Sequence, residues 1–448
     1  MNHYAEQPPI QLMLHRHDAG SEAWWRELSE GEIPRLERLP TGHYRVTFFW
    51  RDPQGSERTS VTRYVWIDIN CVTDHHKMSP ESMERLPGTD VWHWSTILAS
   101  DWRGSYSFIP AADHQRFNPP EGDSRSQRLA QREWWCKTLN RATHDPLNRH
   151  SFWHGSRGQS LSGLHLPDAP PQPAWRDFDL GLGRQPPAAR LQSYRWHSQR
   201  LGNSRTVWIF TTGDAQPDKR PLAILLDGQF WASGMPIWSA LMKQTQSGQL
   251  PQAVYLLIDA IDSAHRSREL TCNDRFWLAL QEELLPQIAD MCAYQDEAAT
   301  TIVAGQSYGG LAALFAGLHW PQRFGCVLSQ SGSFWWPRQD LIQATEAADG
   351  ECWLIEQIKQ GLGSRDTLKI FMEAGRRETL IHRVNQRLFE VLRHTHHPLC
   401  YREFTGGHDA LCWRGGLIDG LTALWSPDFP HWQANSPAGP ITPIRQEP

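Results

Sequence analysis

The chain has 448 residues, which is long enough for two domains that each bury a core of their own. Its 44 Lys and Arg residues are outnumbered by 49 Asp and Glu residues, and the net charge of -5 argues against a nucleic-acid partner. No apolar run reaches membrane-spanning length and the first residues lack the pattern of a secretion signal, so we expect a cytoplasmic protein that does not enter a membrane.

The amino-terminal part of the chain is predicted to be an all-β domain. Short β-rich runs alternate with turn-forming segments such as R-D-P-Q-G-S and R-L-P-G-T-D, a spacing typical of an antiparallel sandwich. A helical segment over 125–140 and a turn at 144–148, H-D-P-L-N, follow these runs. We therefore assign residues 1–165 to a β-sandwich, with its main strands at 44–50, 60–70, 91–98 and 104–110.

The composition changes after residue 165. Residues 166–174 read L-P-D-A-P-P-Q-P-A, and this proline-rich stretch places a linker at 166–188. An antiparallel pair of strands comes next, and apolar strands then alternate with helical patterns. This order predicts an α/β-hydrolase fold over 189–425, with a mostly parallel sheet and helices on both faces. The proline-rich tail, 426–448, is expected to pack little.

Two residue types carry further information. Most of the 23 tryptophans are expected in the core, and some of them in a site for a flat aromatic ligand. The eight cysteines are scattered without C-x-x-C spacing, which favours buried thiols over a disulfide framework or a zinc site. We expect no metal bound by the protein's own side chains.

The stretch G-Q-S-Y-G places Ser307 between an apolar β-branched run and a helix rich in Ala and Leu. A G-x-S-x-G turn of this kind presents a serine hydroxyl at the carboxyl edge of a parallel sheet, beside the amino terminus of a helix. Because the same motif also caps ordinary helices, the assignment of Ser307 as a nucleophile needs partners elsewhere in the chain.

Candidate partners follow the serine in the order that α/β-hydrolases use. Glu378 comes after the predicted strand L-K-I-F-M-E-A-G, and His408 lies in G-G-H-D after the strand L-C-Y-R-E-F-T. Histidine would take the serine proton, and the carboxylate would orient the imidazole. Glu373 lies within its strand and Asp409 adjoins the histidine, so both are less suited to that role.

Other residues are candidates for the oxyanion hole and for substrate binding. The N–H of Tyr308 follows the nucleophile, and the N–H of Gln229 lies in D-G-Q-F-W after an earlier strand. Trp231, in the same loop, is a candidate contact for an aromatic ligand. In S-A-H-R-S-R-E-L, Arg266 and Arg268 either hold an anionic ligand or pair with carboxylates of the protein.

These motifs resemble the enterochelin (enterobactin) esterases, within the esterase D group of α/β-hydrolases. L-L-D-G-Q-F-W, I-D-A-I-D-S-A-H-R-S-R-E-L, G-Q-S-Y-G-G-L, E-A-G-R-R-E and G-G-H-D come in the family's order, after a Trp-rich domain. The resemblance covers nearly the whole chain. The chain differs from the pattern of the wider group at one position, since many relatives have aspartate where this chain has Glu378.

The resemblance implies hydrolysis of the ester bonds of ferric enterobactin, a cyclic trilactone of dihydroxybenzoyl-serine. Ser307 would attack, Glu378 and His408 would complete the triad, and Tyr308 and Gln229 would form the oxyanion hole. Iron would arrive bound to this catecholate siderophore, so no cofactor is implied. The sequence leaves a monomer and a homodimer equally open.

Two other functions remain open at this point. An esterase for another aromatic ester, such as a feruloyl ester, would use the same triad. A noncatalytic siderophore-binding protein would bind the ligand without turnover, and replacement of Ser307 separates this hypothesis from the other two.

Overall fold

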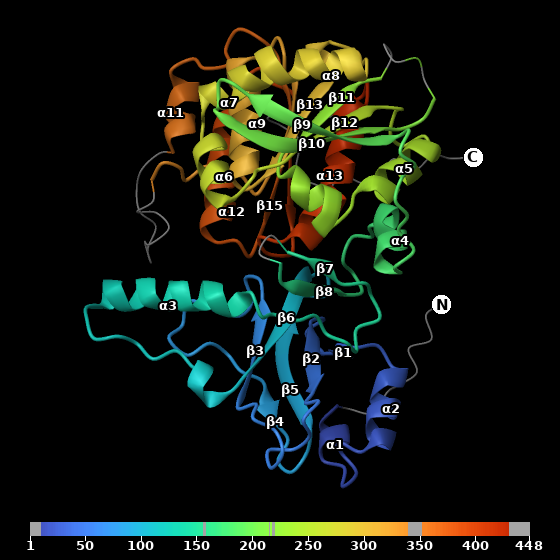
Figure 1. Ribbon diagram of the computed structural model, residues 1–448, viewed down its shortest axis with the longest axis vertical. Coiled ribbons are helices and arrows are strands. Elements are labelled where there is room, and N and C mark those ends of the chain that lie inside the picture. Colours follow the sequence, from blue (N-terminus) through green and yellow to red (C-terminus); the bar gives the residue numbers. More distant parts are fainter. Residues whose placement is uncertain (1–9, 156–157, 215, 217–219, 339–351, 430–448) are drawn as a thin grey trace. The chain divides into compact units, whose positions relative to one another are not determined.

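A computed structural model describes residues 10–155, 158–214, 216, 220–338 and 352–429 of the chain (Figure 1). Its contacts divide the chain into two compact units. The first unit consists of residues 1–182 and 405–411, and the second of 183–404 and 412–448. The division falls inside the predicted linker. The assignment of 405–411 to the first unit is a feature that the sequence did not predict.

The first unit contains two four-stranded sheets, with strand orders β1-β2-β5-β4 and β3-β6-β8-β7. All of their pairings are antiparallel. The strands are β1 (Arg35–Arg38), β2 (Tyr44–Arg51), β3 (Tyr64–Ile69), β4 (Glu84–Arg85), β5 (Val91–Leu98), β6 (Arg103–Ala111), β7 (Trp153–His154) and β8 (Ser160–His165). The helices are α1 (Ile10–Leu14), α2 (Glu22–Glu30), α3 (Ser124–Leu139) and α4 (Arg176–Asp179), with 3₁₀ turns at Asp113–Gln115 and Pro173–Trp175.

A shared apolar core joins these two sheets. Alternate residues of β2 and β5 pack with alternate residues of β3 and β6, because side chains of a strand point to opposite faces in turn. The buried members include Val46, Phe48, Trp92, Ile67 and Phe108. The predicted β-sandwich is therefore confirmed. Several tryptophans lie in the interior as expected, among them Trp24, Trp102 and Trp175.

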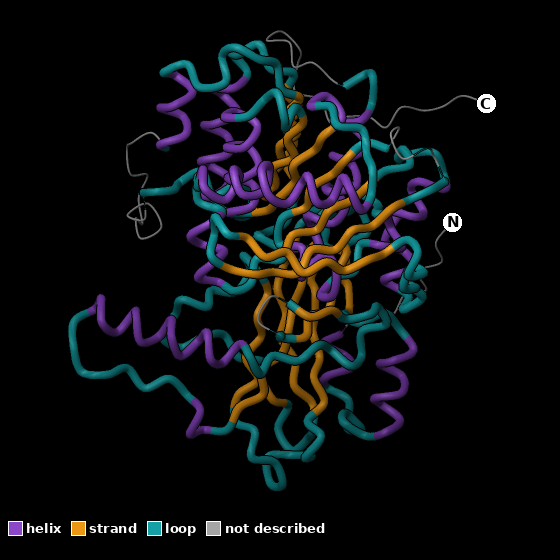
Figure 2. The backbone as a smooth tube through the Cα atoms, turned by 45° about the horizontal axis from the view of Figure 1, so that its top comes forward, coloured by secondary structure: helices purple, strands orange, loops and turns teal. Residues whose placement is uncertain are grey.

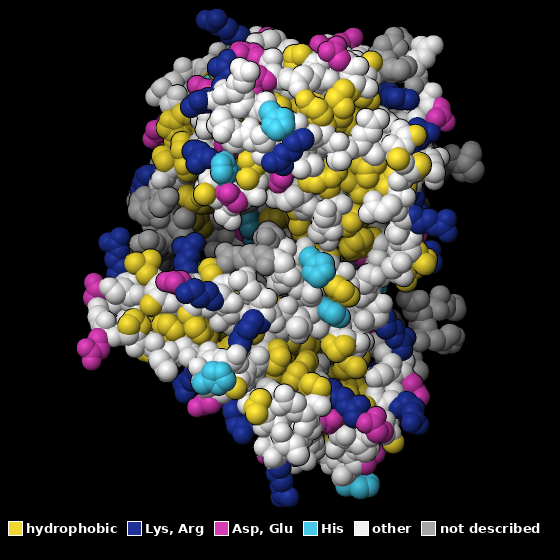
Figure 3. Space-filling model, viewed as in Figure 1, with side chains coloured by type: hydrophobic (Ala, Val, Ile, Leu, Met, Phe, Trp, Pro, Cys, Tyr) yellow, Lys and Arg dark blue, Asp and Glu magenta, His cyan; other side chains and the backbone are white. Residues whose placement is uncertain are grey.

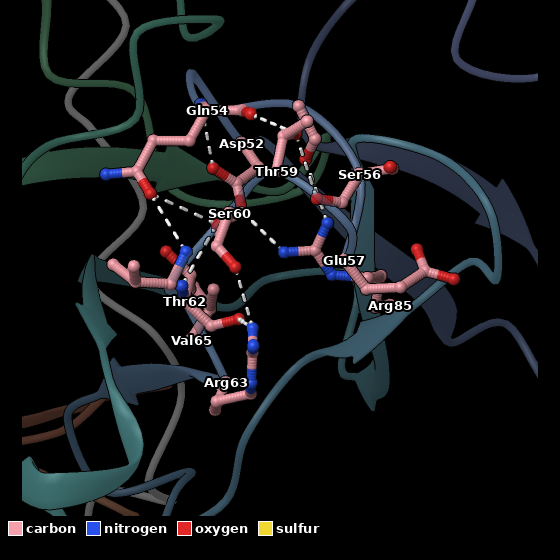
Figure 4. A network of polar contacts seen from close by, with 12 residues as sticks. Asp52, Gln54, Ser56, Glu57, Thr59, Ser60, Thr62, Arg63, Val65 and Arg85 are labelled. Carbon is pink, nitrogen blue, oxygen red and sulfur yellow. Dashed lines mark hydrogen bonds and ion pairs between the residues drawn. The ribbon is translucent and has the colours of Figure 1, made fainter.

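The turn after β2 is fixed by a polar network around Asp52 (Figure 4). Asp52 is buried, and its carboxylate accepts hydrogen bonds from Ser60 Oγ at 2.7 Å and Arg85 Nη2 at 2.5 Å. The backbone N–H of Gln54 donates to the other carboxylate oxygen at 3.0 Å. A buried carboxylate with this many partners holds R-D-P-Q-G-S in one conformation.

A second network explains the D-P-L-N turn. Tyr106 Oη donates to Asp145 Oδ2 at 2.7 Å, and Asn148 Nδ2 donates to Tyr106 Oη at 3.0 Å. The N–H of Asp145 donates to Ser162 Oγ at 2.9 Å. Burial raises the pKa of Asp145 to about 6, while the hydrogen bond from Tyr106 lowers it. The turn is thus attached to β6 and β8 through polar side chains.

The second unit is built on an eight-stranded sheet of order β16-β15-β14-β13-β11-β12-β10-β9. β9 pairs antiparallel with β10, and β10 pairs antiparallel with β12. The other pairings in this sheet are parallel. The strands are β9 (Leu191–Ser198), β10 (Asn203–Thr211), β11 (Leu222–Leu225), β12 (Val254–Ile258), β13 (Thr301–Gln306), β14 (Cys326–Gln330), β15 (Lys369–Gly375) and β16 (Leu399–Phe404).

Helices cover both faces of this sheet. Val303, Val327 and Ile370 belong to the core cluster that holds the buried residues of α7, α8, α9, α11 and α12. On the opposite face, Phe210 meets Trp238 of α5 at 5.1 Å between ring centroids, and Tyr255 meets Trp425 of α13 at 5.9 Å. The strands and their flanking helices can be followed in Figure 2. The α/β-hydrolase prediction is confirmed.

The helices of this unit are α5 (Trp238–Gln246), α6 (Ser263–Glu269), α7 (Asp274–Ala279), α8 (Leu285–Met291), α9 (Tyr308–His319), α11 (Trp353–Lys359), α12 (Leu380–Leu392) and α13 (Ala410–Trp425). π-helical turns lie at Phe230–Gly234 and Leu280–Leu284, and a 3₁₀ turn at Ala298–Thr300. The helical stretch from residue 274 to 291 thus consists of α7, a π-turn and α8. Most of the predicted tail lies outside the described residues.

None of the helices within the described ranges is both long and apolar enough to cross a membrane. On the face drawn in Figure 3, the coloured Lys and Arg side chains are interspersed with Asp and Glu. On this face, basic side chains do not gather into one broad patch.

The Tyr106 network predicts a pH-dependent change in stability. In Tyr106→Phe, Asp145 loses the hydrogen bond that lowers its pKa, so the folded-state pKa rises further above the unfolded value near 3.9. A raised carboxyl pKa costs stability as pH rises through it. Urea unfolding should show a loss of about 1–3 kcal/mol at pH 8 and a smaller loss at pH 4.5.

Tyr64→Phe is the matched control, because the Tyr64 hydroxyl on β3 makes an exposed hydrogen bond of 3.3 Å to Asp113. Its loss should stay below about 0.5 kcal/mol at both pH values. A loss in Tyr106→Phe that is equal at the two pH values would contradict the role given to Asp145.

Candidate active site

The carboxyl ends of four neighbouring strands meet at one edge of the second unit's sheet. Gln306 at the end of β13 pairs in register with Gln330 of β14, and Gln330 pairs with Glu373 of β15. Gly375 at the end of β15 pairs with Phe404 at the end of β16. Ligands of open α/β sheets collect at such edges, so the residues just beyond these strand ends are the first candidates for a site.

Ser307 lies in the sharp turn between β13 and α9. Its backbone has φ 59° and ψ −119°, in the region that residues with a side chain rarely adopt. Its N–H donates to Gln330 O at 3.0 Å, which attaches the turn to β14. The residue is only partly buried, and its Oγ lies 3.1 Å from Ser333 Oγ. The geometry is that of a strained nucleophile elbow.

The first glycine of the motif makes this turn possible. A Cβ on Gly305 would lie 2.4 Å from the backbone C and O atoms of Gly309, which cannot move without opening the turn. At Gly309 itself, the nearest atom to a Cβ would be an Asp227 oxygen at 3.5 Å, an ordinary contact. The steric requirement for glycine therefore falls on Gly305.

A chain of buried polar side chains runs beneath the elbow. Trp231 Nε1 donates to Gln306 Oε1 at 3.1 Å, and Gln306 Nε2 donates to Gln330 Oε1 at 2.7 Å. Gln330 Nε2 continues the chain to Glu373, whose other oxygen accepts from Arg402 Nε at 2.6 Å. We call these five residues the polar chain. Each side chain fixes the next, so the strand ends below Ser307 are held in register.

The polar chain changes the assignment of two residues. Trp231 is 1% exposed and is bonded to Gln306, so it has a structural role in place of the predicted contact with the substrate. Glu373 is 1% exposed and is held by Gln330 and Arg402, in agreement with its rejection as the triad acid.

Arg266 also has a structural partner. Its Nε and Nη2 donate to the two carboxylate oxygens of Asp227 at 2.6 and 2.7 Å, and Nη2 also donates to Gln306 O at 3.3 Å. Burial lowers the pKa of Arg266, but the charge of Asp227, its hydrogen bonds and the smaller effect of Tyr308 together outweigh burial, so the net shift is upward. Its guanidinium lies over the Tyr308 ring, 5.6 Å from the centroid. Arg266 thus joins the loop after β11 to the elbow.

Arg268 differs from Arg266. It is exposed on α6, and none of the described residues forms an ion pair or hydrogen bond with its guanidinium. Glu269, one of the carboxylates considered for it, instead pairs with Arg205 at 2.7 Å. Arg268 is therefore the better candidate of the two for a charged ligand.

Glu378 lies between β15 and α12. It is 5% exposed, and its Oε2 accepts the N–H of Gly375 at 2.7 Å. The N–H of Glu378 in turn donates to Gly375 O at 3.0 Å. These two bonds fix the carboxylate in the turn that follows the strand end.

His408 follows β16 by four residues and lies in the segment that groups with the first unit. The neighbouring Asp409 is 4% exposed, and it accepts hydrogen bonds from the N–H and Oγ of Ser105 at 2.6 and 2.5 Å. Asp409 therefore binds β6, consistent with its rejection as the triad acid.

The two predicted oxyanion donors occupy the expected elements. Tyr308 is the first residue of α9 and directly follows Ser307. Gln229 follows β11, and its side-chain Oε1 accepts the N–H of Ala260 at 3.0 Å. A Cβ on the preceding Gly228 would lie 2.5 Å from the Ile258 backbone, so this loop passes close against β12.

Sequence reasoning missed Ser333. Its Oγ lies 3.1 Å from Ser307 Oγ, and its N–H donates to Ser307 O at 3.0 Å. The available signal was S-Q-S-G-S, residues 329–333, which begins in the last two residues of β14, the strand adjacent to β13.

Residues 394–397 read H-T-H-H, and two of these histidines have partners within the protein. His397 is 5% exposed and its Nδ1 accepts the N–H of Leu368 at 3.3 Å, and burial lowers its pKa to about 4. His396 Nε2 lies 2.9 Å from Asp366 O. Within the described part of the chain, no group of three or more His, Cys, Asp or Glu side chains is placed to hold a metal ion.

Comparison with known families divides the chain much as its structure does. Residues 45–175 match the amino-terminal domain of enterochelin esterases, and residues 198–424 match the family described as putative esterases. The first match covers most of the β-sandwich, from β2 to β8, and the second covers β10 to β16 together with the elbow.

Individual relatives are similar over nearly their whole length. An iron(III) enterobactin esterase from Dickeya dadantii is 50% identical over 426 residues, which cover 94% of this chain and 97% of the relative. The iron(III) enterobactin esterase of Escherichia coli K12 is 51% identical over 92% of this chain and 98% of its own. An iron(III) salmochelin esterase from Escherichia coli is 27% identical over 91% of this chain.

Solved structures agree with these similarities. The ferric enterobactin esterase of Salmonella typhimurium has a TM-score of 0.78 and 50% identity, covering 91% of this chain and 100% of its own. The enterobactin esterase of Shigella flexneri, crystallised in the presence of enterobactin, has a TM-score of 0.76 and 48% identity over 91% of this chain and 99% of its own. With its sandwich, its hydrolase sheet and its elbow all matched, this chain belongs to the enterobactin (enterochelin) esterase family.

Proposed function

We propose that this protein is a serine esterase that hydrolyses the trilactone ester bonds of ferric enterobactin. The observation that carries the proposal is the near-50% identity to iron(III) enterobactin esterases across both units. The partly exposed Ser307 in its strained turn supplies a nucleophile for that chemistry. The products would be linear dihydroxybenzoyl-serine chains and finally the monomer.

The proposed first step is acylation of Ser307. His408 takes the hydroxyl proton as Oγ bonds to a lactone carbonyl carbon, and the ring C–O bond breaks as His408 protonates the departing alkoxide. Water then attacks the acyl-enzyme, again with His408 as base, and Ser307 regains its proton. Glu378, held by Gly375, orients the imidazole and stabilises its cation.

The proposed oxyanion hole consists of the Tyr308 and Gln229 amides. Tyr308 belongs to the first turn of α9, where backbone N–H groups lack partners within the helix. The Arg266–Asp227 pair supports this arrangement, because it joins the loop of Gln229 to the elbow. Donors fixed before the reaction stabilise the developing negative charge at little reorganisation cost.

Iron enters this scheme only as part of the substrate. The ferric catecholate complex is anionic, and the exposed guanidinium of Arg268 on α6 is the cation that we assign to it. We place the reaction in the cytoplasm, where eight scattered cysteines without disulfide or zinc spacing remain reduced.

One experiment distinguishes the proposed function from the two alternatives, an esterase for another aromatic ester and a noncatalytic siderophore-binding protein. Purified protein is incubated with ferric enterobactin, and the linear trimer, dimer and monomer are followed by chromatography. Release of these products supports the proposal. A simple aryl ester is tested in parallel. If the protein cleaves the aryl ester but leaves the siderophore intact, an esterase for another aromatic acyl group is favoured. If it cleaves neither compound, a siderophore-binding protein is favoured.

Ser307→Ala should lower siderophore hydrolysis by about a thousandfold or more, because no other group can form the acyl-enzyme. Binding of ferric enterobactin, followed by fluorescence quenching of the tryptophans, should remain. Ser333→Ala is the matched control, since its hydroxyl lies 3.1 Å from that of Ser307 but not on the elbow. The proposal fails if Ser333→Ala is the inactive variant and Ser307→Ala retains turnover.

Arg268→Gln should raise KM for ferric enterobactin about three- to tenfold and leave kcat nearly unchanged, because it removes an exposed charge that attracts the ligand. The effect should shrink at high salt and be absent with a neutral aryl ester. Arg275→Gln, an exposed arginine on α7, is the control. If the two variants have the same KM, the assignment of Arg268 to the substrate site is wrong.

A further inference from the structure

The segment that carries His408 is held by the β-sandwich. Thr405–Leu411, which we call the histidine segment, follows the last strand of the second unit, but its contacts group it with the first unit. It is part of neither the β-sheet core of the first unit nor the sheet of the second. Its conformation therefore depends on the side chains and backbone groups that bind it.

The two ends of the histidine segment are each fixed by hydrogen bonds. At its start, the N–H of Arg103 donates to Thr405 O at 3.1 Å, and Thr405 Oγ1 donates to Asp101 Oδ2 at 2.7 Å. At its end, Gln172 Nε2 donates to Leu411 O at 3.0 Å. The residues that bind these two ends all come from the sandwich and from the stretch predicted to be a linker.

The centre of the histidine segment is fixed by Asp409. One carboxylate oxygen accepts both the N–H and the Oγ of Ser105, at 2.6 and 2.5 Å, and the other accepts the N–H of Leu411 at 2.8 Å. Ser105 lies on β6 past the end of β3, whose last residue pairs with Tyr106. Asp409 thus occupies the position beyond the end of β3.

Close packing restricts the segment further. A Cβ on Gly407 would lie 2.5 Å from Asn70 Oδ1 and 2.8 Å from Cys71 Cβ, so only glycine fits there. A second carboxylate, Asp68, lies nearby, and burial together with the Asp409 charge raises its pKa to about 6. The residues on both sides of His408 are therefore restrained by the same sandwich.

We propose that Ser105 and Asp409 are positioning residues for His408, so that the β-sandwich is required for catalysis as well as for any substrate contact. This inference rests on the proposed role of His408 as the general base. Proton transfer needs the imidazole within hydrogen-bond reach of the serine, and a displacement of about 1 Å lowers the rate strongly. A segment outside both sheets needs external bonds to meet that requirement.

The test compares serine variants of β6 in the full chain. Ser105→Ala removes the hydroxyl that donates to Asp409, and kcat with a neutral aryl ester should fall about tenfold while KM and the melting temperature stay close to wild type. Ser105→Thr keeps the hydroxyl and should restore most of kcat. Ser107→Ala is the matched control, because Ser107 lies two residues along β6, is buried, and has an Oγ without a hydrogen-bond partner among the described residues.

Thr405→Val provides an independent variant, since it keeps the side-chain shape and removes only the bond to Asp101. It should lower kcat about two- to fivefold with KM unchanged. The inference is overturned if Ser105→Ala and Thr405→Val lose no more kcat than Ser107→Ala. It is also overturned if kcat falls only in parallel with the melting temperature and Ser105→Thr restores neither.

The aryl ester separates this inference from the proposed function. If wild type cleaves the aryl ester but not ferric enterobactin, the substrate assignment fails while the Ser105 comparison still decides the inference. If wild type cleaves neither ester, both fall.

Discussion

The steric contact between Gly305 and Gly309 is the constraint on which the proposed chemistry depends. Because the two backbones meet where any Cβ would clash, β13 turns into α9 within a single residue, and Ser307 takes a positive φ. The polar chain and the Arg266–Asp227 pair hold the surrounding strand ends and loops against this turn. A partly exposed hydroxyl in a strained turn thus lies above a hydrogen-bonded chain of side chains.

Most of the fold could be predicted from the sequence because its signals are local. Alternating β-runs in the first unit and apolar strands between helices in the second each appear within short windows of sequence. The membership of Thr405–Leu411 in the first unit could not be predicted, because it depends on bonds such as Ser105 to Asp409, across 304 residues of sequence. Proline-rich composition also suggested a linker where Leu166 and Trp175 are buried.

The candidate site shows the same limit. Ser307, Glu378 and His408 are proposed from motifs and their order, which a sequence displays directly. Trp231 was assigned to the substrate because aromatic residues suit an aromatic ligand, yet its indole is buried against Gln306. Arg266 and Arg268 could not be distinguished by sequence, since the partner of Arg266, Asp227, is 39 residues away. Residue type suggests a chemistry, but only the packing shows which side chains are already bonded.

The most direct test of the account is covalent labelling of the proposed nucleophile. The protein is treated with a reactive aryl phosphonate, the labelled peptide is identified by mass spectrometry, and the remaining hydrolysis of ferric enterobactin is measured in the same samples. The account predicts that the label resides on Ser307 and that hydrolysis declines in proportion to labelling. Complete labelling of Ser307 with hydrolysis of the siderophore retained would contradict it.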